Sequence, residues 1–341
     1  MAQKANKLVK LNLRTGNVVP VTTIPGSLKT KIFRTNYFTR SMFRRSVLWG
    51  NITDDGATIF STRDGIFRLN DDNNCICELD YEPKKYFLDT TICKNVKGFE
   101  NAIYAGDYFS NPDMKPVSIW RRMSGNWEIV HTFPEKIMNH IHAIVPDNYN
   151  HCVWILTGDF DNGPTIWKAE ENFSKVTQFF SPEQKYRACW LKYSYDKIIW
   201  ATDTQLSKNA VYRCVDLQGS KDEELIVEIP GSSIYFSKIN GYHFFSTTLE
   251  PERASRKNLL AWFDTKPAPV LAKDGAGIYV LCSDDSVVEI LRTECGGLPL
   301  RIFEYPTFKF PNVVGKADFL CAYGRNVKHF NDSLIIYKLP N

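Results

Sequence analysis

Two histidines separated by one residue are the most distinctive chemical feature of this sequence. His140 and His142 stand in the run NHIHAIV, and side chains at i and i+2 of a β-strand lie on the same face. Asp159 follows the next apolar run, so these side chains could form an acid/base pair or half of a metal site. A structural histidine pair, hydrogen-bonded within the fold, is an equally open alternative. Because His-x-His and one Asp do not fill a tetrahedral shell, we predict no metal and no cofactor.

Carboxylates recur at the ends of other apolar runs. Besides Asp159 they are Asp64, Asp107, Asp203 and Glu250. Two carboxyl groups that face each other across a glycosidic bond are what glycoside hydrolysis requires. An Asp at a strand end also commonly caps a turn through its own side chain, and this alternative stays open for each of them.

A basic residue accompanies these carboxylates. Arg187 precedes the run ACWL and is expected beside Asp203, with Trp190 nearby. A guanidinium can hold a substrate carboxylate through two parallel hydrogen bonds. The same arginine could instead form a salt bridge with Asp203 and only fix the loop.

The elements that must position these residues form a repeat. Apolar runs rich in β-branched and aromatic residues are bounded by Gly, Asp, Asn and Pro, which is typical of strands. Comparable segments begin at Ala57, Ala102, Cys152, Ile198 and Tyr242, at spacings of 45, 50, 46 and 44 residues, and another begins at Phe319. Such a period, with four strands per repeat, indicates a β-propeller rather than two sandwich domains.

We therefore predict one all-β domain over 1–341, a six-bladed β-propeller of four-stranded antiparallel blades. The last blade lacks an outer strand, so the N-terminal segment 8–23, through strand 17–23, is expected to complete it and close the ring. The segment 251–275 is expected to be an insertion on the face of the predicted site: a lid, a dimer contact or a surface excursion.

In a propeller, the loops between the second and third strands of each blade and the entries to the innermost strands lie on one face. We expect the candidate site at the mouth of the central channel on that face. The candidate catalytic residues are Asp64, His142, Asp159, Asp203 and Glu250. The candidate substrate-binding residues are Arg44, Arg45, Arg63, Asp107, His140, Arg187, Trp190, Tyr323 and Arg325; Tyr108 and Phe160 are further aromatic candidates near the mouth.

Composition narrows the class of protein. Lys and Arg number 42 against 38 Asp and Glu, so the net charge of +4 gives no nucleic-acid footprint. No apolar stretch is long enough for a membrane span, and the first residues lack the apolar core of a secretory signal. Nine cysteines without a CxxC pattern are expected to be reduced, which favours a cytoplasmic location. Most of the 13% aromatic residues fall on predicted strands and are expected to pack between blades.

Two predicted turns resemble the Asp-box, Ser-x-Asp-x-Gly-x-x-Trp. The turn at Ser124-Gly125-Asn126-Trp127 keeps the Gly and Trp, and Ser283-Asp284-Asp285 keeps the Ser and an Asp. The chain thus resembles a divergent member of the sialidase-like (Asp-box or BNR-repeat) superfamily of six-bladed propellers. The resemblance implies an arginine triad for a substrate carboxylate, an acid and a tyrosine assisted by a glutamate. The matching positions are Arg44 or Arg45 with Arg187 and Arg325, then Asp64, then Tyr323 with Glu250.

These observations favour a glycoside hydrolase-like enzyme that acts on a glycan or sugar-containing small molecule at the channel mouth. A lyase with His142 as the proton-transfer group is a second enzymatic reading. A non-catalytic glycan-binding propeller and a protein-interaction propeller are the alternatives. The sequence leaves the oligomeric state open.

Overall fold

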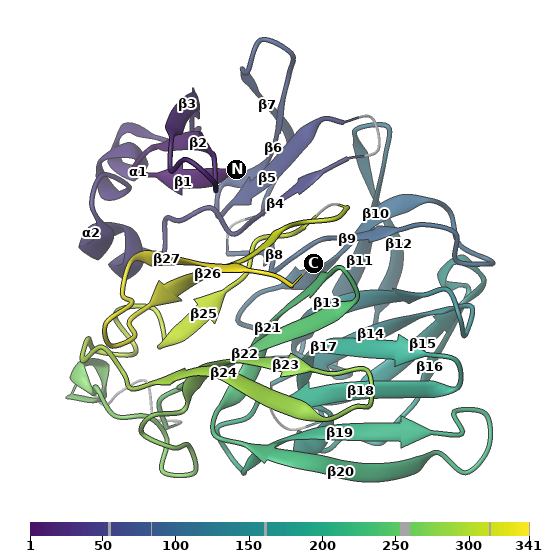
Figure 1. Ribbon diagram of the computed structural model, residues 1–341. Helices are drawn as coiled ribbons and strands as arrows, with labels where there is room; N and C mark the ends of the chain where they lie inside the picture. The colour runs from purple at the N-terminus through teal and green to yellow at the C-terminus, as the bar shows by residue number, and fades with distance from the viewer. Residues whose placement is uncertain (54–55, 83, 160–161, 253–259, 314, 341) are drawn as a thin grey trace.

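The computed structural model describes residues 1–53, 56–82, 84–159, 162–252, 260–313 and 315–340. It is an all-β propeller of seven antiparallel sheets, each built from strands that follow one another along the chain (Figure 1). Four sheets have four strands: β4 (Trp49–Ile52), β5 (Thr58–Thr62), β6 (Gly65–Leu69) and β7 (Cys75–Asp80); β13 (His140–Asp147), β14 (Cys152–Gly158), β15 (Ile166–Glu170) and β16 (Lys175–Gln178); β17 (Ala188–Ser194), β18 (Lys197–Thr202), β19 (Asn209–Val215) and β20 (Asp222–Ile229); β21 (Ser232–Ile239), β22 (Tyr242–Thr248), β23 (Ala276–Leu281) and β24 (Val287–Thr293).

The other three sheets depart from this pattern. In one of them the innermost strand is split into two short pieces that both pair with β10. The remaining two have three strands each. The sheet with the split inner strand consists of β8 (Tyr86–Phe87), β9 (Thr91–Cys93), β10 (Ala102–Tyr108), β11 (Val117–Met123) and β12 (Asn126–Phe133). The two three-stranded sheets consist of β1 (Ala2–Lys4), β2 (Lys7–Leu11) and β3 (Val18–Thr23), and of β25 (Thr307–Lys309), β26 (Phe319–Arg325) and β27 (Ser333–Lys338).

The prediction of six blades was wrong, because the N-terminal segment folds as a sheet of its own. Strand β3, predicted to complete the last blade, pairs instead with β2, from Lys7↔Thr23 to Leu11↔Val18. Leu8 and Ile24 are buried with Phe60 and Phe67 of the next sheet, which explains why the segment packs as an additional blade. Two short helices, α1 (Leu28–Phe33) and α2 (Tyr37–Met42), connect this sheet to β4.

In the four-stranded sheets and in the sheet with the split inner strand, the order of strands agrees with the predicted repeat. Phe60, Tyr104, Trp154, Trp200 and Phe244 recur on the second strand of their sheets and are all at most 3% exposed. Packing of these rings between neighbouring sheets forms the core. The segment between β22 and β23 corresponds to the predicted insertion 251–275; its residues 260–263 form a short 3-10 helix, and 253–259 lie outside the described residues.

Candidate active site at the channel mouth

A cluster of polar side chains gathers where β13, β14, β17, β18 and β22 meet one face of the propeller. We call it the mouth cluster, and it comprises His140, His142, Asp159, Arg187, Cys189, Asp203 and Glu250. The inner strands β13 and β17 each change register near this face, between Ile141 and Ala143 and between Ala188 and Leu191. Such bulges redirect side chains, and here they lie next to His142 and Cys189.

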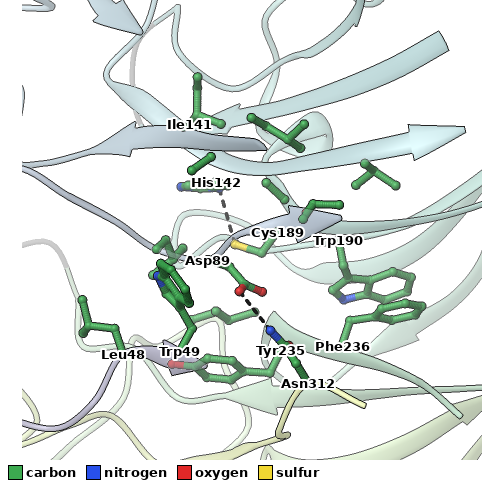
Figure 2. Close-up of a pocket in the computed structure, with 18 of the residues that line it drawn as sticks. Leu48, Trp49, Asp89, Ile141, His142, Cys189, Trp190, Tyr235, Phe236 and Asn312 are labelled. Atoms are coloured by element: carbon green, nitrogen blue, oxygen red, sulfur yellow. Dashed lines mark hydrogen bonds between the residues drawn. The ribbon is translucent and has the colours of Figure 1, made fainter. Parts of the chain in front are cut away.

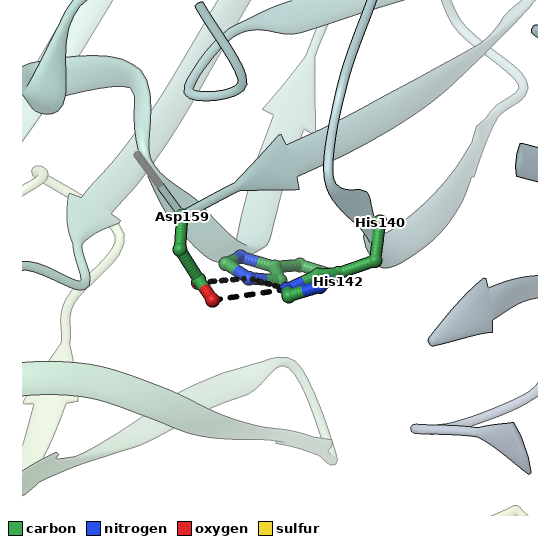
Figure 3. A group of neighbouring side chains, drawn as sticks. All are labelled: His140, His142 and Asp159. Carbon is green, nitrogen blue, oxygen red and sulfur yellow. Dashed lines mark hydrogen bonds and ion pairs between the residues drawn. The ribbon is translucent and has the colours of Figure 1, made fainter. Parts of the chain in front are cut away.

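The two histidines and Asp159 meet at van der Waals distance or closer (Figure 3). The Nε2 atoms of His140 and His142 are 3.1 Å apart. Asp159 Oδ1 lies 3.1 Å from His142 Nε2, and Oδ2 lies 3.4 Å from His140 Nε2. On the other side of each ring, Nδ1 lies 3.0 Å from a backbone carbonyl oxygen, that of Phe109 for His140 and that of Ala188 for His142. Both rings are buried, so their orientation is fixed by these contacts.

Arg187 joins the carboxylates of three different loops. Its Nη2 atom lies 3.0 Å from Asp159 Oδ1, 3.5 Å from Asp203 Oδ2 and 3.8 Å from Glu250 Oε2. Its Nη1 donates to Gln205 Oε1 at 2.7 Å. The guanidinium is 3% exposed, and a buried arginine surrounded by carboxylates keeps its charge. Arg187 therefore fixes the positions of the acidic groups at the mouth.

The carboxyl groups differ in their proton affinity. Burial raises the pKa of Glu250, and the neighbouring Asp203 adds to this more than Arg187 offsets it, so the pKa of Glu250 is about 8. Burial acts in the same direction on Asp159, but His140 and Arg187 outweigh it and hold the pKa of Asp159 well below its usual range. A pair of carboxyl groups with such divergent pKa values is typical of acid/base sites. Burial beside Asp203 raises the pKa of the Cys189 thiol, which argues against a thiolate nucleophile.

A cavity of about 370 Å³ continues from the mouth cluster into the centre of the propeller (Figure 2). Its lining includes His142 and Cys189 from the cluster, and Trp49, Asp89 and Tyr235 from other sheets. The Asp89 carboxylate projects into this space and accepts a hydrogen bond from Asn312 Nδ2 at 3.4 Å. The mouth thus has room behind it for small polar molecules.

An arc of neighbouring aromatic rings, tilted against one another, extends the site away from the histidines. Tyr108 lies 4.2 Å from the His140 ring, Tyr86 lies 5.3 Å from Tyr108, and the Arg63 guanidinium lies 4.8 Å above Tyr86, all measured to ring centroids. The Arg44 guanidinium lies 5.9 Å from the Tyr305 ring. Tyr86, Tyr108 and both arginines are partly exposed, so part of each side chain is accessible to a ligand.

Other predicted residues are engaged elsewhere. Asp64 lies 3.2 Å from Arg45 and 3.5 Å from Arg34, both from the segment between β3 and β4. Arg325 donates to Ser41 and Ser46, and the Tyr323 hydroxyl donates to Asp332 rather than meeting Glu250. The arginines of the implied triad are thus divided among separate carboxylates, since Arg325 pairs with Glu304 at 3.6 Å and Arg187 with Asp159.

Two further candidates have structural partners in the core. The Asp107 carboxylate accepts hydrogen bonds from Ser118 N and Trp120 Nε1 at 3.0 and 2.9 Å. Trp190 is 3% exposed and packs on Phe236 and Phe245, with its Nε1 donating to Ser233. Phe160 lies outside the described residues.

The sequence reasoning missed several residues near the mouth. Cys189 was treated as an ordinary buried thiol, but its Sγ lies 3.4 Å from His142 Nδ1 and 3.3 Å from Asp203 Oδ2. Tyr305 and Glu304, which precede β25, were also missed; burial opposes ionisation of Glu304, but Lys309 and Arg325 outweigh it and lower the pKa of Glu304 to about 2. The one available signal for Cys189 was its position near the start of β17, two residues after Arg187, which immediately precedes that strand.

Comparisons with known proteins support the fold. No family model and no curated protein matches the sequence. An oligogalacturonate lyase in complex with manganese has a TM-score of 0.55 at 10% identity, covering 98% of this chain and 83% of that one. A gluconolactonase from Xanthomonas campestris has a TM-score of 0.51 at 10% identity, covering 88% of each. The dihydro-heme d1 dehydrogenase NirN has a TM-score of 0.51 at 11% identity, covering 99% of this chain and 62% of that one.

At these identities the likeness concerns architecture alone. The two turns that resemble Asp-boxes do lie between the third and fourth strands of their sheets, β11–β12 and β23–β24. The neighbours nevertheless do not single out a sialidase-like superfamily. No described helix is both long and apolar enough to cross a membrane. The chain is a β-propeller with structural neighbours among propeller enzymes.

Proposed function

We propose that this protein is a glycoside hydrolase-like enzyme that acts on a glycan at the channel mouth. The observation that carries the proposal is the placement of two buried carboxyl groups, Asp203 and Glu250, around one guanidinium nitrogen of Arg187. Asp203 Oδ2 and Glu250 Oε2 are no more than about 7 Å apart, the sum of their distances to that nitrogen. This limit admits the carboxyl separations used in either retaining or inverting hydrolysis.

Each residue then has a role in proton transfer or positioning. Glu250, protonated at neutral pH, donates a proton to the oxygen of the leaving sugar. Asp203, across the same guanidinium, serves as the nucleophile or as the base that activates water. Arg187 holds the two carboxyl groups in their relative positions, and Asp159 keeps Arg187 in place. Tyr86 and Tyr108 offer apolar faces on which sugar rings stack.

The structural neighbours give this proposal secondary support. The printed names of two of them, an oligogalacturonate lyase and a gluconolactonase, refer to sugar-derived substrates. Sugar chemistry therefore occurs on propellers of this architecture. Because fold does not determine function, the proposal depends on the mouth cluster and not on the neighbours.

Turnover of a panel of neutral and acidic oligosaccharides tests the proposal, with new reducing ends as the readout. We expect wild-type protein to cleave at least one member, and Glu250→Gln and Asp203→Asn to lose about 10²–10⁴-fold in kcat. Glu128→Gln, which removes an exposed carboxylate on β12, is the matched control and should retain full activity. Equal turnover by wild type and both mouth variants would refute the assignment.

Non-catalytic glycan binding is the second candidate, favoured by the partly exposed Tyr86, Tyr108 and Arg63. If the protein only binds, glycans will be retained unchanged, and Tyr108→Ala will abolish binding while Glu250→Gln leaves it intact. Detection of any cleaved product that depends on Glu250 excludes this candidate.

We further place the protein in the cytoplasm. All nine cysteines are free, as expected in a reducing compartment. Fractionation of the native cells with an antibody to the protein would test this, and recovery from the extracellular fraction would refute it.

A further inference from the structure

We infer that His140, His142 and Asp159 bind one divalent first-row transition-metal ion at the channel mouth. The inference is independent of the proposed hydrolysis, because it concerns three side chains that do not include the proposed acid or its partner carboxylate. It also replaces the sequence-based expectation of no metal, which rested on counting ligands for a closed tetrahedral site.

The hydrogen bonds of the two rings determine where their lone pairs point. A backbone carbonyl oxygen can only accept, so Nδ1 of each neutral ring must carry the proton that bonds to Phe109 O or Ala188 O. The lone pair of each ring in its neutral form is then on Nε2, the two Nε2 atoms face each other at 3.1 Å, and a metal ion takes the place of any proton held there. Histidines that ligate metals are commonly held in this way, with the outer nitrogen donating to a carbonyl.

The carboxylate of Asp159 brings a third acceptor to the same point. Its oxygens lie 3.1 and 3.4 Å from the two Nε2 atoms. Three lone pairs therefore converge, and a cation between them relieves their mutual repulsion. Arg187 Nη2 lies 3.0 Å from Asp159 Oδ1, but this single positive charge is shared with Asp203 at 3.5 Å, so the two carboxylates leave a net negative charge for a cation.

The separations match the edges of a metal coordination shell. With metal–ligand bonds of about 2.1 Å, two ligands are about 3.0 Å apart in an octahedron and about 3.4 Å apart in a tetrahedron. The observed separations span this range: 3.1 Å between the two Nε2 atoms, 3.1 Å from His142 Nε2 to Asp159 Oδ1, and 3.4 Å from His140 Nε2 to the other carboxylate oxygen, Oδ2. Two histidines and one carboxylate on one face form a site that keeps open positions for solvent or substrate.

The open coordination positions of such a site would face the central cavity and the solvent at the mouth. His142 lines the central cavity, and the side chain of Asp159 is 24% exposed towards the mouth. A bound ion would therefore reach both solvent and any substrate held at the mouth. Hydroxyl or carboxylate oxygens of a ligand are the groups it would take as additional ligands.

Direct metal binding tests the inference without an activity assay. The full chain is stripped with a chelator, and then Co²⁺, Zn²⁺ and Mn²⁺ are added separately. We expect one ion per chain by elemental analysis, and visible Co²⁺ absorption bands that Zn²⁺ abolishes by competition. His142→Gln and Asp159→Asn should each weaken the affinity by at least about 100-fold.

His151→Asn is the matched control, because His151 is exposed in the turn between β13 and β14, at the far end of the same sheet. It should bind metal as the wild type does. Circular dichroism and thermal unfolding establish that each variant is folded. Lack of stoichiometric binding by the wild type overturns the inference, as does affinity in both ligand variants that stays within threefold of wild type. The first result would mean that a proton, rather than a metal ion, lies between the rings.

Discussion

Replacement of the buried Glu250 by Gln is expected to stabilise the folded protein at high pH, whereas most substitutions of buried groups destabilise it. Glu250 is 8% exposed and faces Asp203, Arg187, Asp159 and Tyr305, with Ser232 as a hydrogen-bonding neighbour. In these surroundings the neutral carboxyl is favoured over the carboxylate. Glutamine has a similar shape and is neutral at every pH. The folded variant should therefore be most favoured over the wild type at high pH, where the glutamate must ionise.

The magnitude follows from the pKa. The pKa of Glu250 rises from its ordinary 4.5 to about 8 in the folded protein. Each unit corresponds to about 1.4 kcal/mol, so the effect on the free energy of unfolding has a ceiling of about 5 kcal/mol. The contribution of the protonated group is fully present below pH 4.5 and is lost as the pH rises through 8. The wild type should therefore lose stability across this interval in a way that Glu250→Gln does not.

Urea denaturation of both proteins at pH 5 and pH 9, in the presence of a chelator, measures the effect. We expect similar free energies of unfolding at pH 5 and a more stable variant at pH 9. Glu304→Gln is the control of opposite sign, because Lys309 and Arg325 lower the pKa of Glu304 to about 2, and this variant should be less stable at both pH values. Parallel pH profiles for wild type and Glu250→Gln would refute our account of the mouth cluster.

Three further substitutions separate positioning from stability. Arg187→Lys keeps a positive charge but cannot contact all three carboxylates, so kcat/KM on any glycan substrate should fall by at least about tenfold, with little change in the far-ultraviolet spectrum; unchanged kinetics would contradict this role. Gly158→Ala places a Cβ 2.3 Å from His142 Cε1, so metal affinity in the Co²⁺ assay should fall although all three ligands remain; wild-type affinity would show that the ring moves freely. Asp147→Ala leaves the buried Trp154 Nε1 without its acceptor and should cost about 2–4 kcal/mol in urea denaturation while leaving glycan and metal binding intact; an altered affinity would contradict a purely structural role.

Much of the fold could be predicted because strand periodicity is local. The runs HIHAIV (140–145) and CVWILT (152–157) are short and largely apolar, and they lie within β13 and β14. The additional sheet at the N-terminus could not be found in the same way. Its strand β1 has three residues, and its burial against Phe60 and Phe67 depends on contacts far apart in the sequence.

Part of the candidate site could likewise be predicted from local sequence patterns, and part could not. Alternation along one strand and the repeated strand ends sufficed to associate His140, His142 and Asp159, and to place Arg187 beside Asp203. The same reasoning did not predict the position of Trp190. The register shifts between Ala188 and Leu191, and the Trp190 side chain is buried in the core between sheets. The partners of Asp64 come from the helical segment after β3, which lies outside the repeat.

The last sheet and the N-terminal segment lie side by side, but they come from opposite ends of the chain, so no direct connection joins them. Sheets that follow one another in the chain are joined by a direct connection, whereas Arg325 reaches Ser41 and Ser46 across 284 and 279 positions. Compared with a connection of about ten residues, the loop that these contacts close is about five doublings longer, and closing it costs about 3 kcal/mol more entropy. The two hydrogen bonds from a charged donor are sufficient to offset that cost. In the described part of the chain, side-chain contacts hold the ring shut at this point, and Arg14–Asp318, Arg40–Asp332 and Tyr37–Asn331 add to those of Arg325. Loss of Arg325 should therefore weaken this junction while the other sheets stay docked, a partial opening that native-state hydrogen exchange would detect in β25–β27 first.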